Sequence, residues 1–146
     1  MDKFTKHRIS VYGINGCHDA MESNLVEVTQ VYLEKNSPAY NHDGIKTLCA
    51  KMPQDKVTIL DGNSFRDKID TNRSQGVLIK AQASSFSSLP AIEQKNACYV
   101  ILDQVQDPHN LGQILRICAG GSINGVIITD RNSVSMSSAV AQVSQG

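Results

Sequence analysis

A strand, a helix and a second strand follow one another between residues 98 and 129, and this succession constrains the fold more than any other part of the chain. The apolar run Tyr99–Leu102 has the length of a strand and predicts a buried one. Gly125–Thr129 is the return strand. Two strands joined through a helix predict a βαβ unit with parallel strands and a right-handed crossover.

The helix between these strands has a start, an apolar face and an end in its sequence. Asp107-Pro108 predicts the start, because Asp is a favoured N-cap and Pro suits the first helical position. Gly120-Gly121 predicts the end. Apolar side chains spaced i, i+3, i+4 and i+7 form one face: Leu111, Ile114, Leu115 and Cys118.

The loop that follows the first strand is the candidate site. Ligands of open α/β sheets bind beyond the carboxyl ends of the strands, where residues 104–112 lie. On a helical wheel Arg116 points away from the apolar face, toward solvent or a ligand. From the residues alone, Arg116 is an ordinary exposed arginine, Asp107 is a cap, and Asn110 is a helix-start residue.

The first half of the chain alternates short strands and short helices. Between residues 11 and 82, β-branched stretches such as Val57–Leu60 and the run Gly76–Ala81 are separated by helical patterns. This alternation predicts an α/β sandwich with a largely parallel sheet. The basic opening segment, with Lys6 and Arg8, is interpreted as a solvated terminus rather than a nucleic-acid arm.

A serine-rich segment at residues 83–97 predicts an exposed linker between two domains. A domain at residues 8–82 would then precede a second unit at residues 98–146. The total of 146 residues suits one small domain plus part of another.

Composition excludes several classes of protein. The net charge is zero and aromatic residues make up 5% of the chain, which argues against a histone-like protein and against a binder of single strands built on aromatic stacking. The four cysteines have no zinc-site spacing, so no metal ligands are predicted. No secretory segment or long apolar run occurs, which predicts a cytoplasmic protein without membrane contact.

The segment LDQVQDPHNLGQILRICAGGSINGVIITD resembles the first motif of the SpoU/TrmH family of RNA 2′-O-ribose methyltransferases. The family pattern is a strand ending in LD-x-V-x-DP-x-N, followed by Gly, two apolar positions and Arg. The matching residues in this chain are Asp103, Val105, Asp107, Pro108, Asn110, Gly112 and Arg116. The segment RNSVSMSSAVAQVSQG is similar to the family helix that ends in V-x-x-G.

The first half resembles the family's small substrate-binding domain, and the whole is most similar to the bacterial large-subunit rRNA 2′-O-guanosine methyltransferase branch. VYGINGCHDAMES resembles the opening of that α/β/α domain, and RSQGVLIKA resembles its closing strand, with Gln75 and Gly76 in place. Ser74 stands where the family usually has His, which puts one RNA contact in doubt. The resemblance implies RNA-binding roles for Gln75, Gly76, Asn110 and Arg116.

The resemblance also implies a reaction: transfer of a methyl group from S-adenosylmethionine to a ribose 2′-oxygen of RNA, which is expected to be large-subunit rRNA. Arg116 stands in the position of the family's catalytic arginine. We favour an electrostatic role for Arg116, in which it holds a phosphate and stabilises charge on the 2′-oxygen, because a guanidinium is a poor base. Asn110 would orient the arginine or the ribose.

The resemblance further implies a trefoil-knot (SPOUT) methyltransferase domain, of which residues 98–146 would be the start, and a homodimer for the complete enzyme. The family's later cofactor loops are not found in residues 1–146, so no cofactor-binding residues are predicted and this form is expected to be inactive. Two alternatives stay open: a non-catalytic RNA-binding remnant of the family, and an unrelated α/β protein that binds a small molecule.

Overall fold

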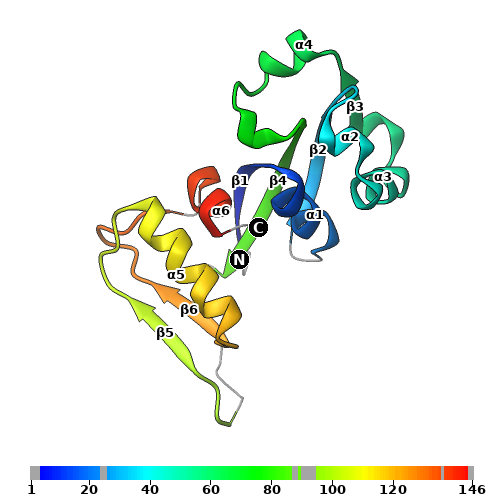
Figure 1. Ribbon diagram of the computed structural model, residues 1–146. Coiled ribbons are helices and arrows are strands. Elements are labelled where there is room, and N and C mark those ends of the chain that lie inside the picture. Colours follow the sequence, from blue (N-terminus) through cyan, green and yellow to red (C-terminus); the bar gives the residue numbers. More distant parts are fainter. Residues whose placement is uncertain (1–3, 24–25, 87–88, 90–94, 136, 145–146) are drawn as a thin grey trace.

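The computed structural model describes residues 4–23, 26–86, 89, 95–135 and 137–144, which form a four-stranded sheet, a two-stranded sheet and their helices (Figure 1). The elements of the first half are β1 (Phe4–Tyr12), α1 (Ile14–Glu22), β2 (Val26–Glu34), α2 (Pro38–Asn41), α3 (Asp43–Ala50), the 3-10 turn η1 (Gln54–Lys56), β3 (Val57–Leu60), α4 (Gly62–Arg66), the 3-10 turn η2 (Asn72–Ser74) and β4 (Val77–Phe86). Those of the second half are β5 (Tyr99–Leu102), α5 (Pro108–Gly120), β6 (Gly125–Ile128) and α6 (Ser138–Ser144).

The four-stranded sheet has the order β1-β4-β2-β3 and is mostly antiparallel. β4 runs antiparallel to both β1 and β2, and only β2 and β3 are parallel. The α/β class is confirmed, whereas the predicted largely parallel sheet is wrong. The alternation of strands and helices does not reveal that β4 returns between β1 and β2, and that return makes two of the pairings antiparallel.

The opening segment is a strand, not a solvated terminus. β1 pairs with β4 along its whole length, from Phe4 opposite Phe86 to Tyr12 opposite Leu78. The pairing also carries β4 into the predicted linker, because residues 83–86 belong to the sheet. Much of the rest of the linker, residues 87–88 and 90–94, lies outside the described residues.

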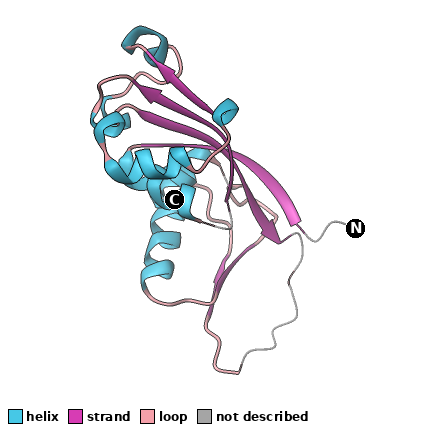
Figure 2. Ribbon diagram, turned by 90° about the vertical axis from the view of Figure 1, so that its right-hand side faces the viewer, coloured by secondary structure: helices cyan, strands magenta, loops and turns pink. Residues whose placement is uncertain are grey.

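One face of this sheet carries the main core. Alternating residues of β1, β2 and β4, among them Val11, Val31 and Ile79, are fully buried together with Cys17 of α1 and Ile45 of α3. On the other face, α4 covers only the end near Tyr32, over whose ring the Lys68 ammonium lies at 5.4 Å. The helices accordingly gather mainly to one side of the strands (Figure 2).

Cys17 is a core residue whose thiol we expect to be unreactive. Burial is the main cause that raises its pKa to about 12, and its Sγ donates a hydrogen bond to the Val11 carbonyl at 3.3 Å. At pH 8 the folded protein therefore holds Cys17 as the neutral thiol, which is a poor nucleophile. We expect iodoacetamide to label the exposed Cys98 readily and Cys17 only after denaturation. Mass spectrometry that found equal labelling of the two in the folded protein would contradict this.

The second sheet consists of β5 and β6, parallel and in register from Tyr99 opposite Gly125 to Leu102 opposite Ile128, with α5 as the connection. The predicted βαβ unit is thus present. The prediction of a buried first strand is wrong for the described chain, since Ile101 of β5 is 69% exposed. The apolar run of β5 could be buried by a neighbouring element, but no element of the described chain covers the side of the sheet on which Ile101 lies.

Helix α6 joins the two halves. Its Ser138 Oγ accepts a hydrogen bond from the Ser10 amide at 2.8 Å, and its Gln142 amide group exchanges two hydrogen bonds of 3.1 Å with the Tyr12 backbone. These are groups on the outer edge of β1, which lies at the end of the sheet. The same helix packs against α5, so it covers a strand edge of the first half and holds the second half against it.

No helix in the described part of the chain is both long and apolar enough to span a membrane.

Candidate functional site

The carboxyl ends of β5 and β6 are joined by hydrogen bonds that centre on Thr129. Its Oγ1 accepts from the Gln104 amide at 3.3 Å, donates to Asp103 Oδ1 at 3.3 Å, and lies 2.9 Å from Ser133 Oγ. The Val134 amide also donates to the Val105 carbonyl at 2.8 Å. The loop after β5 is therefore held against the loop after β6. The sequence reasoning missed Thr129, whose only signal is a polar residue at the end of the return strand.

Helix α5 begins as the sequence predicts. Asp107 is the N-cap, its Oδ1 accepts from the His109 amide at 2.9 Å, and Pro108 is the first helical residue. The cap fixes where the helix starts after the β5 loop, and so it fixes the positions of the side chains that follow.

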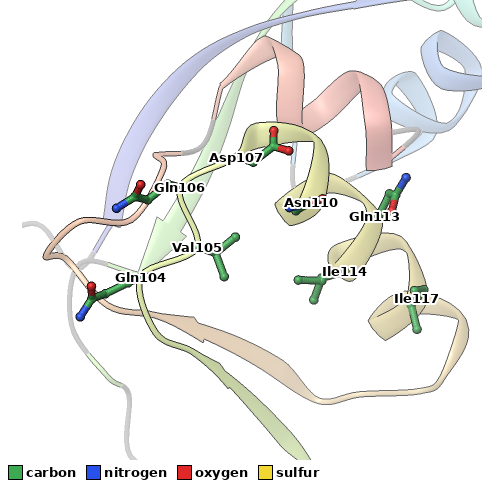
Figure 3. A pocket seen from close by; sticks show the side chains of 8 residues that line it. All are labelled: Gln104, Val105, Gln106, Asp107, Asn110, Gln113, Ile114 and Ile117. Atoms are coloured by element: carbon green, nitrogen blue, oxygen red, sulfur yellow. The ribbon is translucent and has the colours of Figure 1, made fainter.

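A hollow lies between the β5 loop and α5 (Figure 3). Asn110 is exposed and lines it, with loop residues on one side and helix residues on the other. Ile117 is 73% exposed, so the apolar wall of the hollow is open to solvent. The full lining comprises Gln104, Val105, Gln106, Asp107, Asn110, Gln113, Ile114 and Ile117.

Arg116 lies on α5 but does not line this hollow. It is exposed, as the helical wheel predicts, and its guanidinium has no hydrogen-bond or ion-pair partner among the described residues. Arg116 is six positions after Asn110 on the helix, which corresponds to about 120° around it and about 9 Å along it. No hydrogen bond joins the two side chains in the described chain, so both are free to contact a ligand from different sides of α5.

Gln75 and Gly76 lie far from α5 in the chain and have structural roles in the first sheet. Gln75 Oε1 accepts a hydrogen bond of 2.9 Å from the Ile14 amide at the start of α1, whose N-cap Gly13 offers no side chain. Gly76 is buried at a φ of 83°. Ser74 is also buried, and its Oγ accepts a weak hydrogen bond from the Gly76 amide at 3.4 Å. Among the described residues, the Gln75 amide nitrogen has no partner and remains available to a ligand.

The hollow does not by itself form a site for S-adenosylmethionine. Ile117 is 73% exposed, and the lining comes only from the β5 loop and α5, so within the described chain no further element closes the hollow around a nucleoside. The described chain also has no cluster of His, Cys, Asp and Glu side chains able to hold a metal ion.

The fold is that of the SpoU methyltransferases. AviRb from Streptomyces viridochromogenes, a SpoU methyltransferase solved in complex with AdoMet, superposes with a TM-score of 0.71 over 95% of this chain and 51% of its own, at 14% identity. An AdoMet-bound rRNA methyltransferase from Sinorhizobium meliloti gives a TM-score of 0.67 over 95% of this chain and 50% of its own, at 19% identity.

Sequence comparison agrees. The sequence model of the SpoU rRNA methylase family matches residues 97–146. A putative TrmH family tRNA/rRNA methyltransferase, YacO of Bacillus subtilis, is 35% identical over 86 residues, covering 55% of this chain and 34% of the relative. The 23S rRNA (guanosine-2′-O-)-methyltransferase RlmB of Ralstonia nicotianae is 36% identical over 91 residues, covering 59% and 36%. Residues 97–146 therefore match the SpoU rRNA methylase family, and the chain spans about a third of the length of these relatives.

Proposed function

We propose that this chain carries the RNA-recognition domain and the first catalytic elements of an rRNA 2′-O-ribose methyltransferase that uses S-adenosylmethionine. The observation that supports this most strongly is helix α5. It lies within the segment that matches the SpoU family, and it presents two exposed side chains, Asn110 and Arg116, without partners in the described chain. In the proposed division, residues 8–82 bind RNA and residues 98–146 begin the methyltransferase domain.

In the proposed mechanism, Arg116 acts by charge. A ribose hydroxyl becomes a better nucleophile when the negative charge that develops on its oxygen is stabilised, and a fixed guanidinium can do so while holding the adjacent phosphate. Because the Arg116 guanidinium has no partner among the described residues, all five of its N–H donors are available to RNA. S-adenosylmethionine, when bound by the complete enzyme, supplies the methyl group.

Asn110 has a separate role in this proposal. Because it lies about 120° around α5 from Arg116, its amide would orient the ribose rather than the arginine. Gln75 would add an RNA contact from the first domain through its free amide nitrogen, while its carbonyl oxygen remains on the Ile14 amide. The complete enzyme would act as a homodimer and obtain its cofactor site from family segments outside these residues.

A methyl-transfer assay tests the proposal. The chain is joined at Gly146 to the remaining C-terminal part of the Bacillus subtilis relative and incubated with labelled S-adenosylmethionine and large-subunit rRNA. We expect label in 2′-O-methylnucleosides from the joined protein and none from residues 1–146 alone. If the joined protein folds and binds S-adenosylmethionine but leaves the RNA unlabelled, the methyltransferase proposal fails. RNA binding by the chain without methylation in either form would favour the non-catalytic alternative.

A further inference from the structure

A second surface of the first domain has the chemistry of a phosphate-binding site. The strand pairing places Lys6 opposite Ser84, Arg8 opposite Gln82, and Ser10 opposite Lys80. These residues alternate with the buried Ile9 and Ala81, so they share the sheet face opposite the main core. We call this part of β1, β4 and the first half of β2 the open face.

No helix of the described chain covers the open face. α1 contacts the three strands, but its Cys17 and Ala20 are in the main core on the other side. α6 lies along the outer edge of β1, where its Ser138 Oγ accepts a hydrogen bond from the Ser10 amide. Its Ala141 belongs to the main core. α4 contacts β2 and β3 at the far end, near Tyr32. The open face is therefore accessible over its central part.

The open face carries more positive than negative side chains, and most of these cations have no ion-pair partner among the described residues. Among the described residues, Lys6, Arg8 and Lys80 share the open face with one carboxylate, Glu27, although the total charge of the chain is zero. The Lys6–Glu27 pair is 3.9 Å apart and exposed on both sides, so it holds the lysine weakly. Lys80 Nζ donates only to Ser10 Oγ, at 2.8 Å, and Arg8 has no side-chain partner among the described residues.

A hollow of about 480 Å³ lies in the middle of the open face. A β-bulge in β2 between Val28 and Gln30 sets Thr29 at its rim, where the Thr29 hydroxyl donates to the Lys80 carbonyl at 2.9 Å. The lining combines cations with hydroxyl and amide groups and contains no aromatic ring: Arg8, Ile9, Ser10, Thr29, Lys80, Ala81 and Gln82.

We propose that the open face binds the sugar–phosphate backbone of double-helical RNA. Arginine and lysine contact phosphates, and hydroxyl and amide side chains contact phosphates and 2′-hydroxyls. The hollow has no ring on which an unpaired base could stack, which favours a helical backbone over a single strand. The proposal rests on the proposed function, from which it takes RNA as the partner. It adds a contact about 13 to 20 Å along β4 from Gln75-Gly76.

The test measures binding of the whole chain to a fluorescein-labelled hairpin RNA by anisotropy, between 50 and 200 mM KCl. The variant Arg8→Gln/Lys80→Gln removes two cations from the open face. The control Lys46→Gln/Lys51→Gln removes two exposed cations at α3, on the opposite side of the sheet. We expect the first variant to bind about tenfold to a hundredfold more weakly at 100 mM KCl, with a salt slope smaller by about 1.5 to 2, and the control to stay within about threefold of the original chain.

Three results would overturn the proposal. An unchanged affinity and slope in the Arg8/Lys80 variant would remove the open face as the contact. An equal loss of RNA affinity in both variants would show that binding depends on the net charge of the protein and not on the open face. Competition by poly-L-glutamate as effective as that by unlabelled hairpin would assign the face to an acidic protein. Each leaves the methyl-transfer assay unaffected, so failure of the open face is distinguishable from failure of the proposed function.

Discussion

Replacement of Gly76 by alanine is expected to destabilise the four-stranded sheet and the helices packed on it by about 3 kcal/mol or more. A Cβ at this position would overlap the side chain of Ser37, and the φ of 83° is itself unfavourable for an L side chain. Ser37 cannot easily move aside, because it is buried and its Oγ accepts the Tyr40 amide as the cap of α2. Gly76 also pairs with β2 through its carbonyl, which accepts from the Glu34 amide at 2.9 Å.

Thermal unfolding followed by circular dichroism measures this effect. A loss of this size should lower the Tm by about 10 °C or more for a domain of this length. Gly120→Ala is the matched control, since its Cβ would meet nothing within 4 Å at the end of α5, and we expect it to be neutral or slightly stabilising. A Gly76→Ala protein with an unchanged Tm would show that the tight contact with Ser37 is not a feature of the folded chain.

Replacement of Gly112 by alanine is expected to separate α6 from α5. A Cβ there would lie 2.6 Å from Val143 Cβ and 2.9 Å from the Val140 carbonyl oxygen, closer than packed atoms allow. Both contacts are on α6, and Val140 is fully buried. Because α6 also covers the edge of β1, its displacement should release the hydrogen bonds that the Ser10 and Tyr12 amides make with Ser138 and Gln142.

Amide hydrogen exchange measures the loss of these hydrogen bonds between α6 and β1. In Gly112→Ala we expect the Ser10 and Tyr12 amides to exchange about tenfold faster or more, which corresponds to the usual cost of overpacking, whereas the core strand β4 keeps its protection. Gly120→Ala, on the same helix, should leave both amides unchanged. Unaltered protection at Ser10 and Tyr12 in the Gly112 variant would mean that α6 does not link the two halves as described.

The βαβ unit of the second half follows from the sequence, because the residues that begin and end its helix lie next to one another in the chain. The cap at Asp107, the proline after it, and the glycines at the end of α5 each act within one helical turn. The strand order of the four-stranded sheet cannot be predicted in this way, because it depends on pairing between residues far apart in the sequence. Lys6, His7 and Arg8 in β1 are typical of a solvated terminus, although the pairing of β1 with β4 makes it a full strand.

The sequence predicts which residues belong to the candidate site, but not how their side chains lie relative to one another. The resemblance to the SpoU/TrmH motif points to Asn110 and Arg116, and the helical wheel predicts that the arginine is exposed. Neither reveals that, of these two residues, Asn110 lines the hollow and Arg116 does not. Gly112 fitted a family pattern, and its physical reason, the close approach of α6, needs the tertiary structure. Thr129 could not be found from one sequence, because its partners come from two loops.

We propose that α5 carries the catalytic arginine of an RNA methyltransferase, and the Arg116→Lys variant of the joined protein distinguishes this role from a structural one. Lysine keeps the charge but loses the planar fork of donors, so we predict methyl transfer to fall by about a hundredfold or more while the Kd for rRNA changes by less than about threefold. Lys51→Arg at the end of α3 is the control and should retain both values, because this exposed residue lies away from α5 and from the open face. Full methylation by the Arg116→Lys protein would contradict the claim.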